Sequence, residues 1–362
     1  MLEKYKDEAI RLITESGFEL AVSDHIEFKN IGAGCVSSIL RVRLKDSSSI
    51  VVKLTEKDDL SIRSELHNRE LDFYQWLNEK SEEDASEEDF KCPKFYGGYD
   101  CTDNMGLILM EDLSHRISND MNFLTGFNIA SILKVVRELA SIQSQYLSSS
   151  DYLHNKCSST FGAPMLSHDL PGVGMRFDFS SFETNCLPKI DQIKGISSDM
   201  RSKLREWVKP LALFKIQSAM PREVLGVSTT PVHCDLWPEN LLFERHRDEI
   251  DLLSIIDWQC FQIGNPLLDV ASVLGLGMTS EDRKEYTNDV VKFYLEEMEK
   301  RKPRFKKSFY MTLEKAHRLL SLALRYPCVQ LMTAIVTLSD DEVKEHTEEY
   351  ETMATRLRYL ME

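Results

Sequence analysis

The sequence predicts a bilobal α+β fold, in which a small N-terminal lobe of β-sheet and one helix precedes a larger, mainly helical C-terminal lobe. Three observations support this prediction. Strand-like runs and one amphipathic helix fill residues 1–113, whereas helical periodicity dominates residues 114–362. A polar loop flanked by strand-like runs interrupts the second part. At 362 residues the chain is long enough for each lobe to have its own core.

The small lobe is predicted from short apolar runs. Residues 49–54 read as a strand with one embedded lysine, and residues 106–113 read as a buried strand that ends in acidic residues. Between them, residues 62–80 carry large apolar side chains at helical spacing with charges interspersed. The acidic run 81–89 is typical of a solvated loop, so we interpret it as an insertion in this lobe.

The large lobe is predicted to open with an amphipathic helix over residues 127–147. Residues 155–179 are rich in Gly, Pro and Ser, and long irregular segments in compact domains are often lids or binding loops. We expect this segment to border the pocket in which a small molecule binds. The alternative, that its apolar side chains only hold a loop to the surface, has equal weight. Apolar helical faces recur in 284–300 and 308–325, before a last helix that ends near Met361.

The polar loop carries a specific pattern. Residues 233–240 read His-Cys-Asp-Leu-Trp-Pro-Glu-Asn, and this His-x-Asp-x4-Asn spacing is that of a kinase catalytic loop. Asp235 is placed to accept the proton of an acceptor hydroxyl, while Asn240 and the later Asp257 offer oxygen ligands that suit Mg²⁺. The pattern therefore predicts phosphoryl transfer. We expect His233 to orient the loop and not to act as the base.

The first lobe should then contain groups that bind nucleotide phosphates. Gly32 and Gly34 would let backbone amides approach phosphates, although a simple hairpin also explains two glycines. Lys53 matches the strand lysine that holds the α- and β-phosphates in kinases. Its candidate partners are Glu65 and Glu70. Glu70 is preferred because it lies just before two aromatic anchors, and the alternative is that both are solvated acids on a helix surface.

These segments together resemble the ecdysteroid-kinase-like group, also called CHK-kinase-like, within the aminoglycoside phosphotransferase and choline kinase branch of the protein-kinase-like fold. The resemblance runs nearly end to end. Its most specific parts are residues 233–240, 256–259 and 264–270, and its less specific parts are 110–113, 68–74 and Gly32-Ala33-Gly34 with Ser37.

The resemblance implies an ATP-dependent kinase of small-molecule hydroxyls, with ATP at the junction of the lobes. It implies Asp235 as the catalytic base and Asn240 and Asp257 as magnesium ligands. The implied nucleotide-binding residues are Gly32, Gly34, Ser37, Lys53 and Glu70, with backbone groups near Glu111 and Leu113 reading the adenine. Asp269 would support the catalytic loop from the next helix, although a helix-capping role is equally compatible with the sequence.

Two departures from the protein-kinase pattern argue against protein substrates. Trp237 replaces the lysine that follows the catalytic Asp by two residues, and Trp258-Gln259 replaces the Phe-Gly that follows the metal-binding Asp. No long activation loop separates Asp257 from Asp269. The two substitutions and the short connection from Asp257 to Asp269 all favour a metabolite kinase.

The charge composition of the chain restricts the classes of molecule that it is expected to bind. The chain has 44 Lys and Arg against 59 Asp and Glu, a net charge of −15, which argues against nucleic-acid or anionic-membrane binding. The first residues lack the apolar core of a signal peptide, and no uninterrupted apolar run reaches membrane-spanning length, so we expect a cytoplasmic protein without a membrane span. The eight cysteines show no C-x-x-C pair and are interpreted as reduced.

The sequence leaves the acceptor and the oligomeric state open. A steroid-like or other apolar alcohol is slightly preferred from the resemblance and the apolar residues of 155–179. A choline- or ethanolamine-type kinase is the alternative within the enzyme class, because acidic and aromatic side chains suit quaternary ammonium groups. A nucleotide-binding pseudoenzyme is the alternative outside it.

Overall fold

The structure is a computed structural model of the chain. It describes residues 10–11, 13–15, 17–18, 28–33, 37–57, 62–79, 90–102, 105–118, 122–148, 179–209, 212–213, 215–219, 225–247, 249–306 and 308–362. The chain divides into two compact units, of which unit 1 comprises Met1–Lys80 and Cys92–Ile117 and unit 2 comprises Ser81–Lys91 and Ser118–Glu362. The sequence-based boundary at 113/114 and the division at 117/118 differ by four residues, since the strand predicted to end the first lobe is followed by a short turn.

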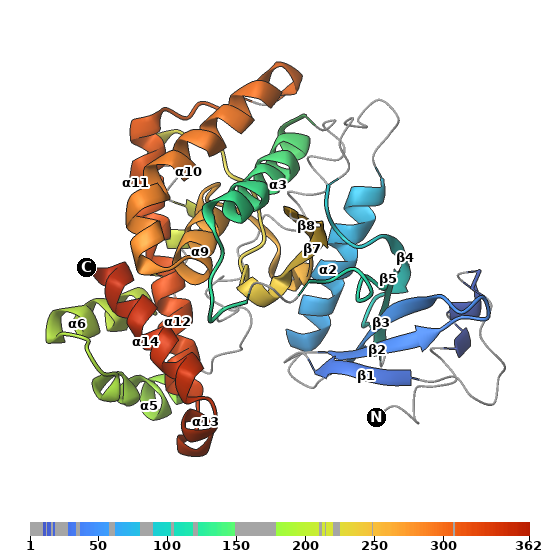
Figure 1. Ribbon diagram of the computed structural model, residues 1–362, viewed down its shortest axis with the longest axis horizontal. Coiled ribbons are helices and arrows are strands. Elements are labelled where there is room, and N and C mark those ends of the chain that lie inside the picture. Colours follow the sequence, from blue (N-terminus) through green and yellow to red (C-terminus); the bar gives the residue numbers. More distant parts are fainter. Residues whose placement is uncertain are drawn as a thin grey trace. The chain divides into compact units, whose positions relative to one another are not determined.

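Unit 1 is built on a five-stranded antiparallel sheet with strand order β1-β2-β3-β5-β4 (Figure 1). Its strands are β1 (Phe28–Ala33), β2 (Ser38–Arg43), β3 (Ser49–Glu56), β4 (Phe95–Tyr99) and β5 (Met105–Glu111). Helix α2 (Ile62–Asn78) packs against β3, β4 and β5. The strands predicted at 49–54 and 106–113 and the helix predicted at 62–80 are confirmed.

The alternation of side chains along β3 decides which residues enter the core. Val52 and Leu54 join a buried cluster on one face of the sheet with residues of β2 and β5. Because successive strand residues point to opposite faces, Lys53 points to the other face, where α2 packs. The strand therefore buries its apolar face and presents one lysine to the helix.

Unit 2 is mainly helical (Figure 1). Its helices are α3 (Ile129–Ser148), α5 (Phe179–Asn185), α6 (Ser198–Trp207), α9 (Leu268–Gly277), α10 (Ser280–Arg301), α11 (Leu313–Ala323), α12 (Arg325–Thr337), α13 (Asp340–Glu345) and α14 (Thr347–Met361). Every residue of α9 is buried, and α3, α10, α11, α12 and α14 all contact it. The helix predicted at 127–147 is confirmed as α3.

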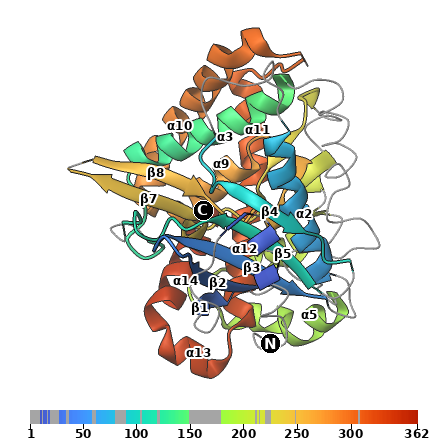
Figure 2. The ribbon, with the colours of Figure 1, turned by 90° about the vertical axis from the view of Figure 1, so that its right-hand side faces the viewer.

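Shorter elements join these helices. They are η1 (Leu187–Gln192), the π-helical η2 (Lys215–Ala219), η3 (Pro238–Asn240), η4 (Trp258–Cys260) and η5 (Lys302–Arg304). Two antiparallel ribbons complete unit 2: β6 (Thr230–Val232) pairs with β9 (Gln262–Gly264), and β7 (Leu241–His246) pairs with β8 (Glu249–Ile255), as Figure 2 shows for the second pair. The loop 233–237 follows β6, and Asp257 follows β8, so Asp235 and Asp257 both lie just beyond strand ends.

One stretch of the described residues, Leu313–Thr337, is long and apolar enough to cross a membrane by length and composition, and 61% of its apolar window is buried in the structure. Core helices pass the same test. The acidic run 81–89 and the segment 155–179 fall outside the described residues, apart from the start of α5 at Phe179. The lid interpretation of 155–179 therefore stays a prediction.

Candidate active site

The lysine of β3 and a glutamate of α2 form a buried ion pair in unit 1. Lys53 Nζ donates to Glu70 Oε2 at 2.5 Å, and the side chains are 8% and 1% exposed. Glu65, the other candidate, instead pairs with Arg69 one turn along the same helix at 3.1 Å. The preference for Glu70 is confirmed. A buried pair of this kind places a fixed positive charge on the sheet, as a phosphate-binding lysine requires.

Ser37 follows the glycine-rich turn and is also buried. Its hydroxyl lies 2.7 Å from the hydroxyl of Thr55, which in turn lies 3.0 Å from Nδ1 of His67. Nε2 of the same ring lies 2.9 Å from the carbonyl oxygen of Tyr99. Burial lowers the pKa of His67 to about 4, so the imidazole is neutral near pH 7. This chain of bonds fixes the start of β2 to β3 and α2.

Of the two glycines of the predicted phosphate-binding turn, the structure describes only Gly32. Gly32 lies near the end of β1, where its backbone pairs with Ile39 after an irregularity in the ladder. Gly34 lies outside the described residues. The role of this turn in phosphate binding stays a prediction.

The end of β5 is held by a carboxylate that no local sequence pattern indicates. Asp112 accepts hydrogen bonds from Arg41 Nε at 2.6 Å and from Ser49 Oγ at 2.6 Å. Although burial favours the neutral acid, these bonds and those from Ser114 lower the pKa of Asp112 to about 2. Glu111 is the last residue of β5 and Leu113 is buried two residues later, so the segment proposed to contact adenine has a fixed backbone.

The loop around Asp235 is held by Asp269 in unit 2. Asp269 is the second residue of α9, and its carboxylate accepts the backbone N–H of His233 at 2.7 Å and of Cys234 at 3.0 Å. Leu267 occupies the N-cap of α9, so the supporting role of Asp269 is confirmed and the helix-capping alternative is wrong. Burial raises the pKa of Asp269 to about 6, against the effect of the two N–H groups.

His233 links the two halves of the loop and is fully buried. Its Nδ1 accepts the N–H of Asp235 at 3.2 Å, so the proton resides on Nε2, which donates to the carbonyl oxygen of Ile256 at 2.8 Å. The ring also packs against Trp258 with centroids 4.5 Å apart. Both ring nitrogens are engaged with backbone, which is the arrangement of an orienting residue and not of a base.

The two predicted metal ligands flank the same end of the β7–β8 ribbon, where Leu241 pairs with Ile255. Asn240 Nδ2 donates to the carbonyl oxygen of Asp235 at 2.7 Å, which turns its amide oxygen the other way. Ile256 donates its N–H to the carbonyl oxygen of Asn240 at 3.0 Å, just before Asp257. Asp257 has a left-handed backbone with φ +66°, and its Oδ2 accepts a hydrogen bond from Gln259 at 3.0 Å.

This donor set fits Mg²⁺. One amide oxygen and one carboxylate are hard ligands, and Mg²⁺ bound together with phosphates needs only one or two protein side chains. The described part of the chain contains no group of three or more His, Cys, Asp or Glu side chains that could hold an ion. Asn240 and Asp257 could therefore hold an ion whose remaining ligands are phosphate oxygens and water.

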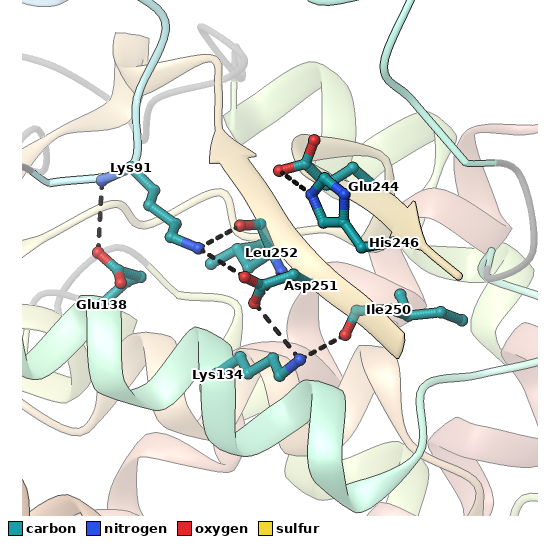
Figure 3. A network of polar contacts seen from close by, with 8 residues as sticks. All are labelled: Lys91, Lys134, Glu138, Glu244, His246, Ile250, Asp251 and Leu252. Atoms are coloured by element: carbon teal, nitrogen blue, oxygen red, sulfur yellow. Dashed lines mark hydrogen bonds and ion pairs between the residues drawn. The ribbon is translucent and has the colours of Figure 1, made fainter. Parts of the chain in front are cut away.

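Lysines fix the β8 strand that leads to Asp257, as Figure 3 shows. Lys91 Nζ contacts Asp251 at 3.2 Å and the carbonyl oxygen of Leu252 at 2.7 Å, and Lys134 from α3 contacts the other oxygen of Asp251 at 3.4 Å. Despite partial burial, these two cations lower the pKa of Asp251. The backbone N–H of Lys91 also donates to Glu138 of α3 at 3.3 Å. The ribbon is therefore anchored on α3.

Trp237, at the position where protein kinases carry lysine, packs inward. Its ring lies 6.1 Å from that of Phe123, and the guanidinium of Arg356 from α14 lies 4.2 Å from the Phe123 centroid. Arg356 also donates to the carbonyl oxygens of Leu276 and Phe123, and its burial lowers its pKa to about 10. An aromatic and cationic stack thus supports this half of the loop 233–240.

The fold and these two groups of residues define the class. A small antiparallel sheet with a buried Lys–Glu pair, and a helical unit with a loop that carries Asp235, Asn240 and Asp257, are the features of a protein-kinase-like fold. The chain belongs to the family DUF1679, whose description reads "Uncharacterized oxidoreductase dhs-27" and whose sequence model matches residues 41–362. DUF1679 is an ecdysteroid-kinase-like family, so the resemblance to that group is confirmed.

Solved structures share this fold at low sequence identity. The GDP complex of wild-type aminoglycoside 2'-phosphotransferase-IIIa is 13% identical, with 96% of this chain and 97% of that chain covered and a TM-score of 0.52. A putative aminoglycoside phosphotransferase from Ralstonia eutropha JMP134 is 13% identical, with 98% of each chain covered and a TM-score of 0.50. Comparison with curated proteins finds no match. The predicted fold class is confirmed.

Proposed function

We propose that the protein is an ATP- and Mg²⁺-dependent kinase that phosphorylates a hydroxyl group of a small molecule. The observation that carries the proposal is the fixed geometry around Asp235: Asp269 holds the preceding N–H groups, His233 holds its own N–H, and Asn240 holds its carbonyl. An aspartate whose backbone is held in this way and whose side chain is only half-buried suits a general base.

In this mechanism Asp235 accepts the proton as the acceptor oxygen attacks the γ-phosphorus and the bond to the β-phosphate oxygen breaks. Lys53, held by Glu70, binds the phosphates, and Asn240 and Asp257 would hold Mg²⁺. Bound by these two residues, the ion would supply positive charge to offset that of the phosphates. The products are ADP and a phosphate ester. Backbone groups near Glu111 and Leu113 are the proposed adenine contacts.

The chemical class of the acceptor is proposed from the charge of the chain and from the resemblance, and not from the geometry of the site. The aminoglycoside phosphotransferases share the fold, so their substrates do not transfer to this chain. The net charge of −15 favours neutral or cationic acceptors. An apolar alcohol is our first candidate, and a choline- or ethanolamine-type alcohol is the second.

The word oxidoreductase in the family description suggests a different activity. Dinucleotide-binding dehydrogenases use a parallel sheet with helices on both faces. In the described parts of this chain, all six strand pairings are antiparallel. The structure therefore favours the kinase over a dehydrogenase of that type.

The test is ADP release from Mg-ATP with a panel of sterols, glycosides, choline and aminoglycosides, run beside NAD(P)H oxidation with the same compounds. Release with one acceptor class, abolished in Asp235→Asn, supports the kinase and identifies the acceptor class. Tight Mg-ATP binding without release favours a nucleotide-binding pseudoenzyme. Oxidation of NAD(P)H without ADP release would refute the proposal.

A further inference from the structure

Tyr326, in the first turn of α12, contacts the catalytic loop from a distant part of the sequence. Its hydroxyl donates to the carbonyl oxygen of Cys234 at 2.6 Å, across a sequence separation of 92 residues. The side chain is buried. Burial raises the pKa of Tyr326 well above its usual value of 10, so the hydroxyl remains a protonated donor at neutral pH.

The residue that Tyr326 contacts has an unusual backbone. Cys234 has φ +66°, a left-handed conformation that residues with a Cβ rarely adopt. Its N–H donates to Asp269 at 3.0 Å and its carbonyl accepts from Tyr326, so both of its peptide groups are bound. Non-glycine residues keep such a conformation only where their surroundings hold it. Here those surroundings are a carboxylate and a phenol.

A second contact connects the two holding groups. The side chain of Gln217, in the π-helical η2, lies beside the hydroxyl of Tyr326. The backbone carbonyl of Gln217 accepts the N–H of Asn265 at 2.7 Å, four residues before Asp269. Isolated π-helical turns are rare and are frequent at functional sites. The short helix thus ties the phenol to the segment that carries the carboxylate.

We propose that Tyr326 is a positioning residue for phosphoryl transfer: with Asp269 it fixes the left-handed Cys234 and hence the direction in which Asp235 leaves the loop. The inference rests on the function proposed above. Asp235 is the next residue, so a rotation of the Cys234 peptide moves its carboxylate directly. A displacement of about 1 Å at a reacting group can lower turnover about 10²-fold.

The first experiment compares Tyr326→Phe with Tyr294→Phe by hydrogen–deuterium exchange of the full chain. Tyr294 is the control because it is also buried and its hydroxyl donates to Gln143 at 2.6 Å without contacting the loop 233–237. In Tyr326→Phe the amides of His233 and Cys234 should exchange about tenfold faster. In Tyr294→Phe they should exchange at the wild-type rate.

The second experiment measures turnover with the acceptor that the panel identifies. Tyr326→Phe should lower kcat by about 10- to 100-fold and change the KM for ATP by less than about twofold, because the group acts on the base and not on the nucleotide. Tyr294→Phe should keep kcat within about twofold of wild type at a similar loss of thermal stability. Adding Cys234→Gly to Tyr326→Phe should recover most of the lost kcat, since glycine adopts φ +66° without strain.

Unchanged exchange in Tyr326→Phe would overturn the proposal. So would faster exchange with wild-type kcat, which would make Tyr326 purely structural, and so would an equal loss of kcat in Tyr294→Phe. If the wild-type protein phosphorylates no acceptor, the proposed function fails. The exchange comparison then still decides whether Tyr326 holds the loop.

Discussion

The carboxylate of Asp269 accepts the backbone N–H of His233 at 2.7 Å, although the two residues are 36 positions apart. The bond joins the first buried helix after the ribbons to the loop that carries Asp235. The carboxylate of Asp269 lies inside the core, and among the described residues no cation pairs with it. Only two N–H groups offset the cost of its burial. The loop geometry is thus maintained at a cost in stability.

This cost predicts a pH dependence. Burial raises the pKa of Asp269 from 3.8 to about 6, so the folded state binds a proton that the unfolded state releases between these values. The stabilising contribution of the protonated group is full below about pH 4 and is lost as the pH rises through about 6. Relative to Asp269→Asn, the wild-type free energy of unfolding should fall by on the order of 3 kcal/mol across this window. Urea unfolding of both proteins at several pH values measures it, and parallel curves would contradict it.

Asp235→Asn should lower turnover by about 10²–10⁴-fold while the fold is retained, because the amide cannot accept the hydroxyl proton. Glu239→Gln is the matched control, since Glu239 is exposed in the same loop. ADP release at saturating Mg-ATP measures both variants. Full turnover by Asp235→Asn would show that another group is the base.

Asp257→Ala should abolish Mg²⁺-dependent nucleotide binding, because the alanine removes the only carboxylate of the proposed pair of metal ligands. Calorimetry with a non-hydrolysable ATP analogue, with Mg²⁺ and with EDTA, measures the metal-dependent part. Gln259→Ala removes the hydrogen bond to Asp257 at 3.0 Å and should weaken binding less. A variant Asp257→Ala that binds the Mg²⁺ complex normally would exclude this residue as the ligand.

Glu70→Gln should raise the KM for ATP and lower the free energy of unfolding by about 3 kcal/mol, because it leaves the buried Lys53 without its carboxylate. Glu65→Gln, on the same helix, removes only a partly exposed contact to Arg69 and should change stability by less than about 1 kcal/mol. Thermal unfolding and ATP titration of the two variants make the comparison. Equal effects would show that the Lys53 pair has no special role.

Local patterns were sufficient for much of the fold. The alternation around Lys53 and the helical spacing of 62–80 and 127–147 arise from burial of one face, which sequence periodicity records directly. The loop 233–240 was readable because its side chains act at fixed, short spacing. The role of Asp112 has no local signal, because its partners Arg41 and Ser49 lie 71 and 63 residues away in the sequence.

Long-range support could not be predicted in the same way. Tyr326 lies in an apolar helix in which a tyrosine reads as an ordinary core residue, and nothing near it in the sequence indicates Cys234. The resemblance implies a nucleotide-binding role for Ser37. Its hydrogen bond to Thr55 depends on the register of β2 and β3, in which Ser38 pairs with Leu54. Register and packing of distant elements decide such contacts, and composition does not record them.

Gly106 faces the ring of His67 so closely that an added Cβ would lie 2.3 Å from its Cδ2 and Nε2 atoms. Helix α2, which carries both His67 and Glu70, can approach the sheet to its present depth only because position 106 has no side chain. The two positions should therefore change together during evolution: wherever a relative has a side chain at the equivalent of 106, we expect a smaller residue than histidine at the equivalent of 67. Such paired substitutions would show that the distance between α2 and the sheet, and with it the burial of Glu70, is maintained among relatives.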